Sequence, residues 1–348
     1  MASTHAGLKM STQLRVPADF ASIQAAVSAA QSGDTVKVAP GTYRERLNIT
    51  TSGISLEAEG GAVVTIDDGL FTAADEVPGG GYLPGWILGY RVDAVGPPDQ
   101  YTDHVTIKGF TFQGSGRTVG LVGLHAARDC RITGNTFTGT TSAINIHSNI
   151  ARIEIDHNNM TGTANIRDAT VEVSGVTTVF EGLSTDPALR RANLDISIHH
   201  NRISGFTRGL YLEGFEGGSI DHNDFDANIM GMQVRGGIRL TIENNDASDS
   251  GPDLLTTAGK TAVRAAGFAL QNVTHTTVSK NHAERNGRGL MIRADSKDYQ
   301  DRGYPPTSDV LVEKNHFTCS TAPDGDMVPA APPPGVVYSD NHTGCDGN

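Results

Sequence analysis

The sequence has little of what marks proteins that bind nucleic acid, span membranes or hold structural zinc. Its 27 Lys and Arg residues are outnumbered by 39 Asp and Glu residues, and the net charge of −12 gives no general reason to expect nucleic acid or an anionic membrane as a partner. No apolar run approaches the roughly 18 residues that span a membrane. The three cysteines, Cys130, Cys319 and Cys345, lack Cys-x-x-Cys spacing, which argues against zinc. We therefore expect neither nucleic acid nor a membrane as a partner, and we assign no metal ligand.

The amino terminus also lacks a secretory signal. Its first residues, MASTHAGLKMSTQ, contain no apolar core of about 7–15 residues, so we expect either a cytosolic protein or the mature or trimmed form of a secreted one. Aromatic residues make up only 6% of the chain, whereas 41 residues are glycine, a composition that suits many short strands and turns. A chain of 348 residues usually divides into two or three domains unless it grows by repetition.

A repeat is present. An apolar residue is followed three positions later by Asn in eight octapeptides: CRITGNTF, IEIDHNNM, ISIHHNRI, GSIDHNDF, LTIENNDA, TTVSKNHA, VLVEKNHF and VVYSDNHT. The repeated residues are Asn135, Asn158, Asn201, Asn223, Asn245, Asn281, Asn315 and Asn341. The segment VTIKGFTF has the same pattern with Phe110 in the Asn place. The shortest spacing is 22, which provides three short strands and three turns, the length of one coil of a parallel β-helix.

Stacked coils place each Asn above the last, about 4.8 Å apart. Asn tolerates the left-handed backbone conformation of a sharp bend, and stacked amides can hydrogen-bond along the column. The chain resembles the right-handed parallel β-helix proteins of the pectin lyase-like superfamily over residues 34–345. The stretch PADFASIQAAVSAAQSGDTVKVAPGTYRERLNIT is similar to their common opening.

The fold we expect is all-β, a single domain over residues 1–348 with about ten coils in a single-stranded right-handed parallel β-helix. A capping helix is expected over residues 19–31, with Asp19 as its N-cap and an apolar stripe of Phe20, Ile23, Val27 and Ala30. Such a helix closes the open end of the stack.

Two cysteines test the predicted register between neighbouring coils. Cys319 and Cys345 each follow a ladder Asn by four residues, so neighbouring coils place them about one strand spacing apart. That separation suits a disulfide and equally suits a pair of stacked thiols. Cys130 is expected in the core.

A second strand repeats about nine residues after most ladder positions. Its alternation predicts two outward columns on one sheet. The first contains Gly123, Asn145, Tyr211, Gln233, Ala269 and Met291, and the second contains His125, His147, Glu213, Arg235, Gln271 and Arg293. In the coil between Asn158 and Asn201 we expect the strand TVEVS, with Glu172 and Ser174 facing outward.

These two outward columns are rich in groups that transfer protons or neutralise charge. A solvated sheet with a Glu213–Arg235 surface ion pair is the alternative. Long insertions at residues 67–103, 174–194, 247–263 and 294–308 border the same sheet in this register, and two walls along a strand face form a groove. In the resembled superfamily that groove generally holds a carbohydrate, often a polyuronate.

We therefore predict as catalytic residues His147, Tyr211, Glu213, Arg235 and Glu172. As substrate-binding residues we predict Trp86, Asn145, Arg208, Gln233, Gln271, Arg288, Met291 and Arg293. Trp86 can stack on a sugar ring or anchor its loop. Arg208, Arg235, Arg288 and Arg293 favour an anionic ligand, unless carboxylates such as Glu213, Asp295 and Asp298 pair with them.

The leading prediction is a lyase or C5-epimerase of a uronic-acid polysaccharide, with Arg235 neutralising the carboxylate and His147 or Tyr211 as base and acid. Calcium can neutralise the carboxylate in related proteins, but no acidic cluster is assigned to it here and no cofactor is predicted. The alternatives are a glycoside hydrolase or transglycosylase using Glu172 and Glu213, a cyclase or isomerase of an apolar small molecule, and a non-catalytic glycan-binding module. The motif GTYRE at residues 41–45 matches a pectin methylesterase, but the other esterase residues are absent.

Overall fold

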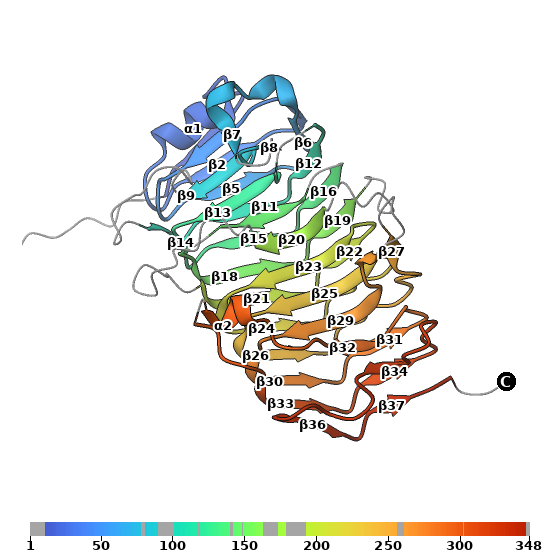
Figure 1. Cartoon of the computed structure of the whole chain (residues 1–348). Helices are drawn as coiled ribbons and strands as arrows, with labels where there is room; N and C mark the ends of the chain where they lie inside the picture. The colour runs from blue at the N-terminus through green and yellow to red at the C-terminus, as the bar shows by residue number, and fades with distance from the viewer. Residues whose placement is uncertain are drawn as a thin grey trace, which may run out of the picture.

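Three parallel sheets run along a single solenoid in the computed structural model (Figure 1). It describes residues 11–77, 81–89, 101–116, 119–139, 142–147, 149–162, 173–178, 193–255, 261–301 and 303–345. Most coils contribute one strand to each sheet in turn, because short strands of the repeat are separated by sharp bends. The all-β solenoid that the Asn spacing predicts is confirmed.

Sheet A is the longest sheet. In spatial order its main path consists of β1 (Gln13–Val16), β2 (Thr35–Val38), β5 (Ser55–Ala58), β11 (Thr106–Lys108), β15 (Arg131–Thr133), β18 (Ala151–Asp156), β21 (Asn193–His199), β24 (Phe215–Asp221), β26 (Ile238–Glu243), β30 (Thr274–Ser279), β33 (Ser308–Glu313) and β36 (Val336–Ser339). Two short strands, β10 (Thr102–Asp103) and β14 (Ala127–Arg128), pair beside this path.

Sheet B consists of short strands in two runs. The first contains β3 (Gly41–Tyr43), β6 (Ala62–Ile66), β12 (Thr111–Gly114), β16 (Thr136–Gly139), β19 (Asn159–Gly162) and β22 (Arg202–Ser204), and the second contains β31 (His282–Glu284), β34 (His316–Thr318) and β37 (His342–Thr343). Isolated parallel bridges at Asp224 and Asp246 connect the two runs.

Sheet C carries the predicted site. Its strands are β4 (Leu47–Ile49), β9 (Trp86–Gly89), β13 (Val122–His125), β17 (Ile144–Ile146), β20 (Ser174–Thr178), β23 (Arg208–Glu213), β25 (Met230–Arg235), β29 (Ala266–Gln271), β32 (Leu290–Ile292) and β35 (Met327–Val328). The ten strands in this described part of the sheet agree with the expected coil number.

The predicted asparagine ladder is present from Asn135 to Asn341. Each side-chain amide donates to the Oδ1 atom of the next ladder Asn, at distances between 2.8 and 3.1 Å. Phe110 occupies the preceding position, and its backbone N–H donates to Asn135 Oδ1 at 3.0 Å. One detail of the prediction is wrong, because the left-handed conformation belongs to the preceding residue, as in His157, φ 53°, and His200, φ 54°.

Helix α1 (Ile23–Ala29) packs at the amino-terminal end, where Ile23, Val27 and the following Ala30 are buried. Its N-cap is Ser22, whose side chain accepts from the Ala25 N–H, so the predicted cap Asp19 and the helix limits 19–31 are wrong. The Asp19 carboxylate instead accepts from the Arg15 N–H at 2.9 Å.

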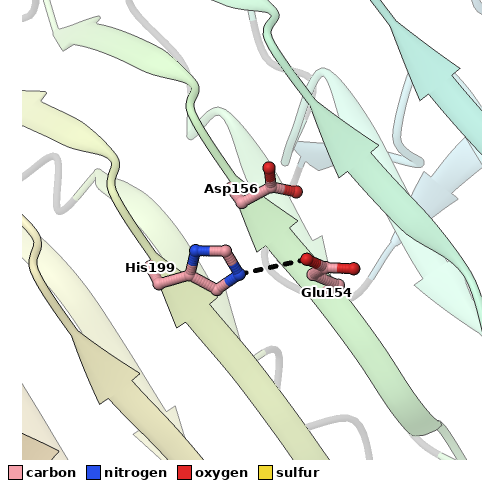
Figure 2. A group of neighbouring side chains, drawn as sticks. All are labelled: Glu154, Asp156 and His199. Atoms are coloured by element: carbon pink, nitrogen blue, oxygen red, sulfur yellow. Dashed lines mark hydrogen bonds and ion pairs between the residues drawn. The ribbon is translucent and has the colours of Figure 1, made fainter.

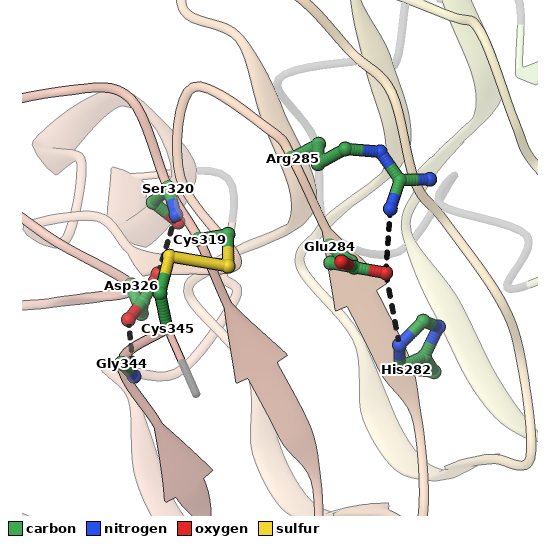
Figure 3. Close-up of a disulfide and its surroundings, with 8 residues drawn as sticks. All are labelled: His282, Glu284, Arg285, Cys319, Ser320, Asp326, Gly344 and Cys345. Carbon is green, nitrogen blue, oxygen red and sulfur yellow. Dashed lines mark hydrogen bonds and ion pairs between the residues drawn. A yellow bond between two sulfur atoms is a disulfide. The ribbon is translucent and has the colours of Figure 1, made fainter. Parts of the chain in front are cut away.

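Cys319 and Cys345 form a disulfide with Cα atoms 4.7 Å apart, which resolves the alternative that the sequence left open (Figure 3). Beside it, Asp326 accepts from the backbone N–H groups of Ser320 and Gly344. Cys130 is a buried free thiol, as expected. None of the helices formed by the described residues has the length and apolar character that a membrane crossing requires.

Candidate functional site

The outer face of sheet C carries the two polar columns in the predicted register. Parallel pairing aligns Asn145 with Thr177, Thr177 with Tyr211, and Tyr211 with Gln233. In the second column Glu213 pairs with Arg235, and Arg235 pairs with Gln271.

Side-chain alternation in β23 separates the core from this face. Leu210 and Leu212 are fully buried in the hydrophobic core. Tyr211 and Glu213 point to the opposite side, where they contact Arg235 of the neighbouring coil. The inward pair therefore fills the solenoid, and the outward pair lies on the outer face of sheet C.

Four side chains form one hydrogen-bonded cluster, which we call the Glu213 cluster: Tyr211, Glu213, Arg235 and Tyr299. Both tyrosine hydroxyls donate to Glu213 Oε1. Arg235 Nη1 donates to the hydroxyl oxygens of Tyr211, at 2.9 Å, and Tyr299, at 3.4 Å, and lies 3.4 Å from Glu213 Oε1. Charge-assisted bonds of this kind hold the carboxylate in one place although it is buried.

Tyr299 reaches the cluster from α2 (Lys297–Asp301), inside the insertion that follows β32. The same insertion places Tyr304 against Gly214 and Gly236, where a Cβ atom would lie within 3 Å of the tyrosine ring or hydroxyl. The sequence prediction missed Tyr299. The only signal was its position in an insertion that borders sheet C.

Burial sets the protonation states of the cluster. It raises the pKa of Tyr211 well above its ordinary value, and the adjacent Glu213 carboxylate acts in the same direction. Burial likewise raises the pKa of Tyr299 to about 12. Both hydroxyls therefore stay protonated at neutral pH and act as hydrogen-bond donors to Glu213.

His147 lies two coils from Glu213 in the same outward column. Burial lowers the pKa of His147 to about 3, and the charge of His125, whose ring centroid is 6.3 Å away, adds to the shift. Its imidazole is therefore neutral at pH 7. Two coil spacings correspond to about 9.6 Å, so the structure does not bring His147 into the Glu213 cluster.

Several arginines surround Tyr211. The Arg208 guanidinium lies 5.0 Å from the centre of its ring and donates to Gln233 Oε1 at 3.0 Å, and Arg235 lies 5.3 Å from the same ring. Among the described residues the Arg293 side chain has no hydrogen bond or ion pair. Burial lowers the pKa of Arg293, and the charges of Arg235, Arg264 and Arg208 lower it further. This excess of positive charge favours an anion beside Tyr211.

Two amides on this face have unused hydrogen-bonding atoms. Asn145 Oδ1 and Gln233 Nε2 are buried and have no partner within the described part of the chain. A buried polar group without a partner costs about 1–3 kcal/mol, so both atoms favour a ligand that supplies a donor and an acceptor.

Three predicted binding residues do not line an open face. Trp86 is fully buried, packs edge-on against Phe110 and Phe112, and donates to the Glu45 carbonyl, so sugar stacking by Trp86 is wrong. Arg288 is buried between Asp253 and Asp324, with ion pairs of 2.8 and 2.9 Å. Met291 is buried in a cluster with Ile229, Met230 and Leu254.

The strand predicted as TVEVS is also wrong. The strand in that coil is β20 (Ser174–Thr178), and its Thr177 lies beside Tyr211. Ser174 is buried rather than outward, and its N–H donates to Ser142 Oγ. Glu172 lies outside the described residues. Gln271 is on the predicted strand face, where its amide donates to the Ala294 carbonyl at 2.8 Å.

The described parts of the insertions adjoin strands of sheet C along the chain. The hairpin of β7 (Glu76–Val77) and β8 (Gly81–Tyr82), with the short 3-10 helices Asp68–Leu70 and Ala73–Asp75, precedes β9. The hairpin of β27 (Leu254–Leu255) and β28 (Thr261–Val263) precedes β29, and α2 follows β32. Parts of the predicted loops 67–103 and 174–194 lie outside the described residues.

Comparisons with known proteins agree with this architecture. A family model described as "Right handed beta helix region" matches residues 189–346. No curated protein sequence matches the chain. An alginate lyase from Paenibacillus sp. str. FPU-7 is 13% identical with a TM-score of 0.62, and the alignment covers 96% of this chain and 99% of the lyase.

Two other solved structures are similar. The A-module of the mannuronan C-5 epimerase AlgE4 from Azotobacter vinelandii is 15% identical with a TM-score of 0.59, covering 92% of this chain and 90% of that one. PfbA, a surface adhesin of Streptococcus pneumoniae, is 14% identical with a TM-score of 0.60, covering 86% and 75%. The ladder, the three sheets and these likenesses show that the chain folds as a right-handed parallel β-helix.

Proposed function

We propose that the protein modifies a uronic-acid-containing polysaccharide at the outer face of sheet C, as a lyase or C5-epimerase that removes the proton next to the sugar carboxylate. The observation that carries this proposal is the Glu213 cluster together with Arg293, three coils along the same column, because they combine a carboxylate, a phenol and a positive charge that has no ion-pair partner among the described residues. An alginate lyase and a mannuronan C-5 epimerase share the fold, and so does an adhesin, so the fold alone does not select the chemistry.

The arginines provide the first requirement of the reaction. Removing a proton next to a carboxylate places a second negative charge on that group, and nearby cations stabilise the resulting enediolate. Arg293 has no partner among the described residues, whereas Arg235 is already held by Glu213 and two tyrosines. In this proposal Arg293 therefore binds the sugar carboxylate, and Arg235, two coils away in the same column, faces the same charge.

Tyr211 and Glu213 provide the second requirement, a path for the proton. The phenol is protonated in the resting protein, so it is not a base by itself. Its hydrogen already points to Glu213 Oε1. As the phenolic oxygen takes the C5 proton, its own proton passes to the carboxylate, and the electron pair of the C–H bond moves into the sugar carboxylate.

Epimerisation and elimination share the removal of the C5 proton and differ in the second step. Return of a proton to the opposite face of C5 inverts the sugar, and loss of the glycosidic oxygen at C4 with a proton produces a double bond. His147 is neutral and lies two coils away, so it is a second proton-transfer group for a sugar bound across the neighbouring coils. Asn145 lies on the coil of His147 and Gln233 on the coil after Tyr211, both in the first column, where they hydrogen-bond sugar hydroxyls.

The test is a substrate screen with matched variants. Polyuronates and neutral glycans are incubated with the protein, and ultraviolet absorbance of unsaturated ends, reducing ends and C5 configuration are measured separately. Unsaturated ends or inverted residues support the proposal. Tyr211→Phe, Glu213→Gln and Arg293→Ala should each lower turnover at least 100-fold. The first two remove a group from the proton path, and the third removes the positive charge that binds the sugar carboxylate.

The control is Arg202→Ala, which removes an exposed arginine of sheet B that pairs with Asp224, and turnover should stay unchanged. Reducing ends without unsaturation would replace the proposal by hydrolysis. Glycan binding without product would indicate a binding module, and a response only to apolar small molecules would indicate a cyclase or isomerase.

A further inference from the structure

A second group of reactive side chains lies on sheet A, on a different face from the Glu213 cluster. Glu154 and Asp156 are on β18, and His199 is on the neighbouring strand β21 (Figure 2). Their potential ligand atoms all lie within 4.8 Å of one another. The three side chains point toward one another because Ile155 and Ile198 face the core between them.

We propose that Glu154, Asp156 and His199 form a binding site for a divalent transition-metal ion, with Zn²⁺ as the representative ion. One imidazole nitrogen and two carboxylates are an accepted Zn²⁺ ligand set with room for a fourth, solvent ligand. His199 Nε2 lies 3.1 Å from Glu154 Oε1, a spacing that two ligands of one ion adopt when each is about 2.0–2.2 Å from it.

The surroundings of the three residues also fit a metal site. The second nitrogen of His199, Nδ1, lies 3.1 Å from His200 Nδ1, which fixes the ring orientation. Asp156 accepts from Thr133 Oγ1 at 2.9 Å and from His157 Nδ1 at 2.7 Å. Outer hydrogen bonds of this kind orient the ligands of metal sites.

The site is open to solvent. The Glu154 side chain is 38% exposed and the His199 side chain 20%, so an ion has access to both. Asp156, in contrast, is fully buried beneath its partners and provides a rigid third ligand.

Arg131 supplies the positive charge between the two carboxylates in the metal-free protein. Its guanidinium lies 2.7 Å from Asp156 and 3.4 Å from Glu154, and its side chain is 44% exposed. An arriving divalent ion therefore competes with Arg131, which can turn toward solvent. This competition predicts that removal of the guanidinium strengthens metal binding.

The position of the site suggests a structural consequence. The ladder residues of these two coils, Asn158 and Asn201, are 43 residues apart, so the coil between them contains long insertions. An ion held by β18 and β21 joins the two coils on sheet A. Zn²⁺ should therefore raise the melting temperature, by mass action on the folded state.

The experiment titrates metal-free full-length protein with Zn²⁺ by calorimetry and with Co²⁺ by visible absorption, and records thermal melts. Wild type should show a binding site that is at least tenfold weaker in both Glu154→Gln and His199→Asn, while Arg131→Gln should bind more tightly. His275→Asn is the matched control, since it removes an exposed histidine with a single carboxylate partner, Asp309, and should bind as wild type does.

Melts without metal verify that each variant folds. Equal Zn²⁺ affinity and stoichiometry in wild type and His199→Asn would overturn the proposal, and so would the absence of Zn²⁺ binding by wild type. An affinity lowered by Arg131→Gln would also contradict it, because it would assign Arg131 a supporting rather than a competing role. The readouts do not involve glycans, so the outcome is independent of the proposed function.

Discussion

Replacing one residue of the asparagine ladder should destabilise the protein far more than replacing its neighbour. Asn158 Oδ1 accepts from both the backbone N–H and the side-chain amide of Asn135, and its own amide donates to the Ile132 carbonyl and to Asn201 Oδ1. Asn158→Ala removes all four bonds in a buried environment.

The magnitude follows from the groups that lose a partner. The backbone N–H of Asn135 loses its acceptor and the Ile132 carbonyl loses a donor, whereas Asn201 Oδ1 still accepts from the Asn158 N–H. A buried unsatisfied group costs about 1–3 kcal/mol, so two such groups cost about 2–6 kcal/mol. That is a large share of a typical stability of about 5–15 kcal/mol.

Urea unfolding followed by circular dichroism measures the effect. The control is Asn159→Ala, because Asn159 is the next residue, is exposed on β19, and has no side-chain hydrogen bond within the described residues. Its expected change is within about 0.5 kcal/mol. Equal unfolding midpoints for the two variants would refute the assignment of stability to the ladder.

Two further predictions concern pH and the carboxy-terminal coils. Burial raises the pKa of Asp226 to about 6, with Asp224, Asp246 and Asp249 acting in the same direction. Because the unfolded state loses this proton first, at about pH 4, stability should fall as pH rises from about 4 to 6. Asp226→Asn should therefore raise the melting temperature at pH 7 and not at pH 4; an equal rise at both would contradict this. Replacing Cys319 and Cys345 together by Ser opens a link between residues 26 apart and should cost about 3.5 kcal/mol in the chain-entropy model. A midpoint unchanged by both this replacement and reduction would contradict that estimate.

The repeat made the fold predictable because each coil satisfies the same constraints. A buried amide must find partners, so the ladder Asn recurs in a fixed frame, and alternation around Leu210 and Leu212 places Tyr211 and Glu213 outside. The alignment of Cys319 with Cys345 on neighbouring coils follows from the same spacing, because each lies four residues after a ladder Asn. Residues whose environment is set within one coil or between adjacent coils could therefore be placed from the sequence.

Residues whose environment depends on insertions could not be placed in this way. Arg288 pairs with Asp253 and Asp324, which lie more than 30 residues away on either side. Tyr299 reaches Glu213 across 86 residues. In both examples the path of an insertion decides the contact, and the periodic pattern contains no information about that path.

Trp86 was misplaced for a different reason. The prediction places Trp86 in the insertion of residues 67–103, whereas WILG aligns with VGLH and Trp86 pairs with Val122 at an inward position. The alternation of inward and outward side chains along this strand places Trp86 in the core. The strand predicted as TVEVS failed because two alternating registers of the same segment looked alike, and burial of Val176 selected the later one.

The central claim is that the Glu213 cluster removes the proton at C5 of a uronic acid, and solvent exchange tests it most directly. A polyuronate that the protein binds is incubated in D₂O with wild type or with Glu213→Gln, and deuterium at C5 or unsaturation between C4 and C5 is followed by NMR. The account predicts deuterium incorporation or C4–C5 unsaturation with wild type and at least a 100-fold slower reaction with the variant. Wild type that cleaves the polymer with neither exchange nor unsaturation, or a Glu213→Gln variant that reacts at the wild-type rate, would contradict it.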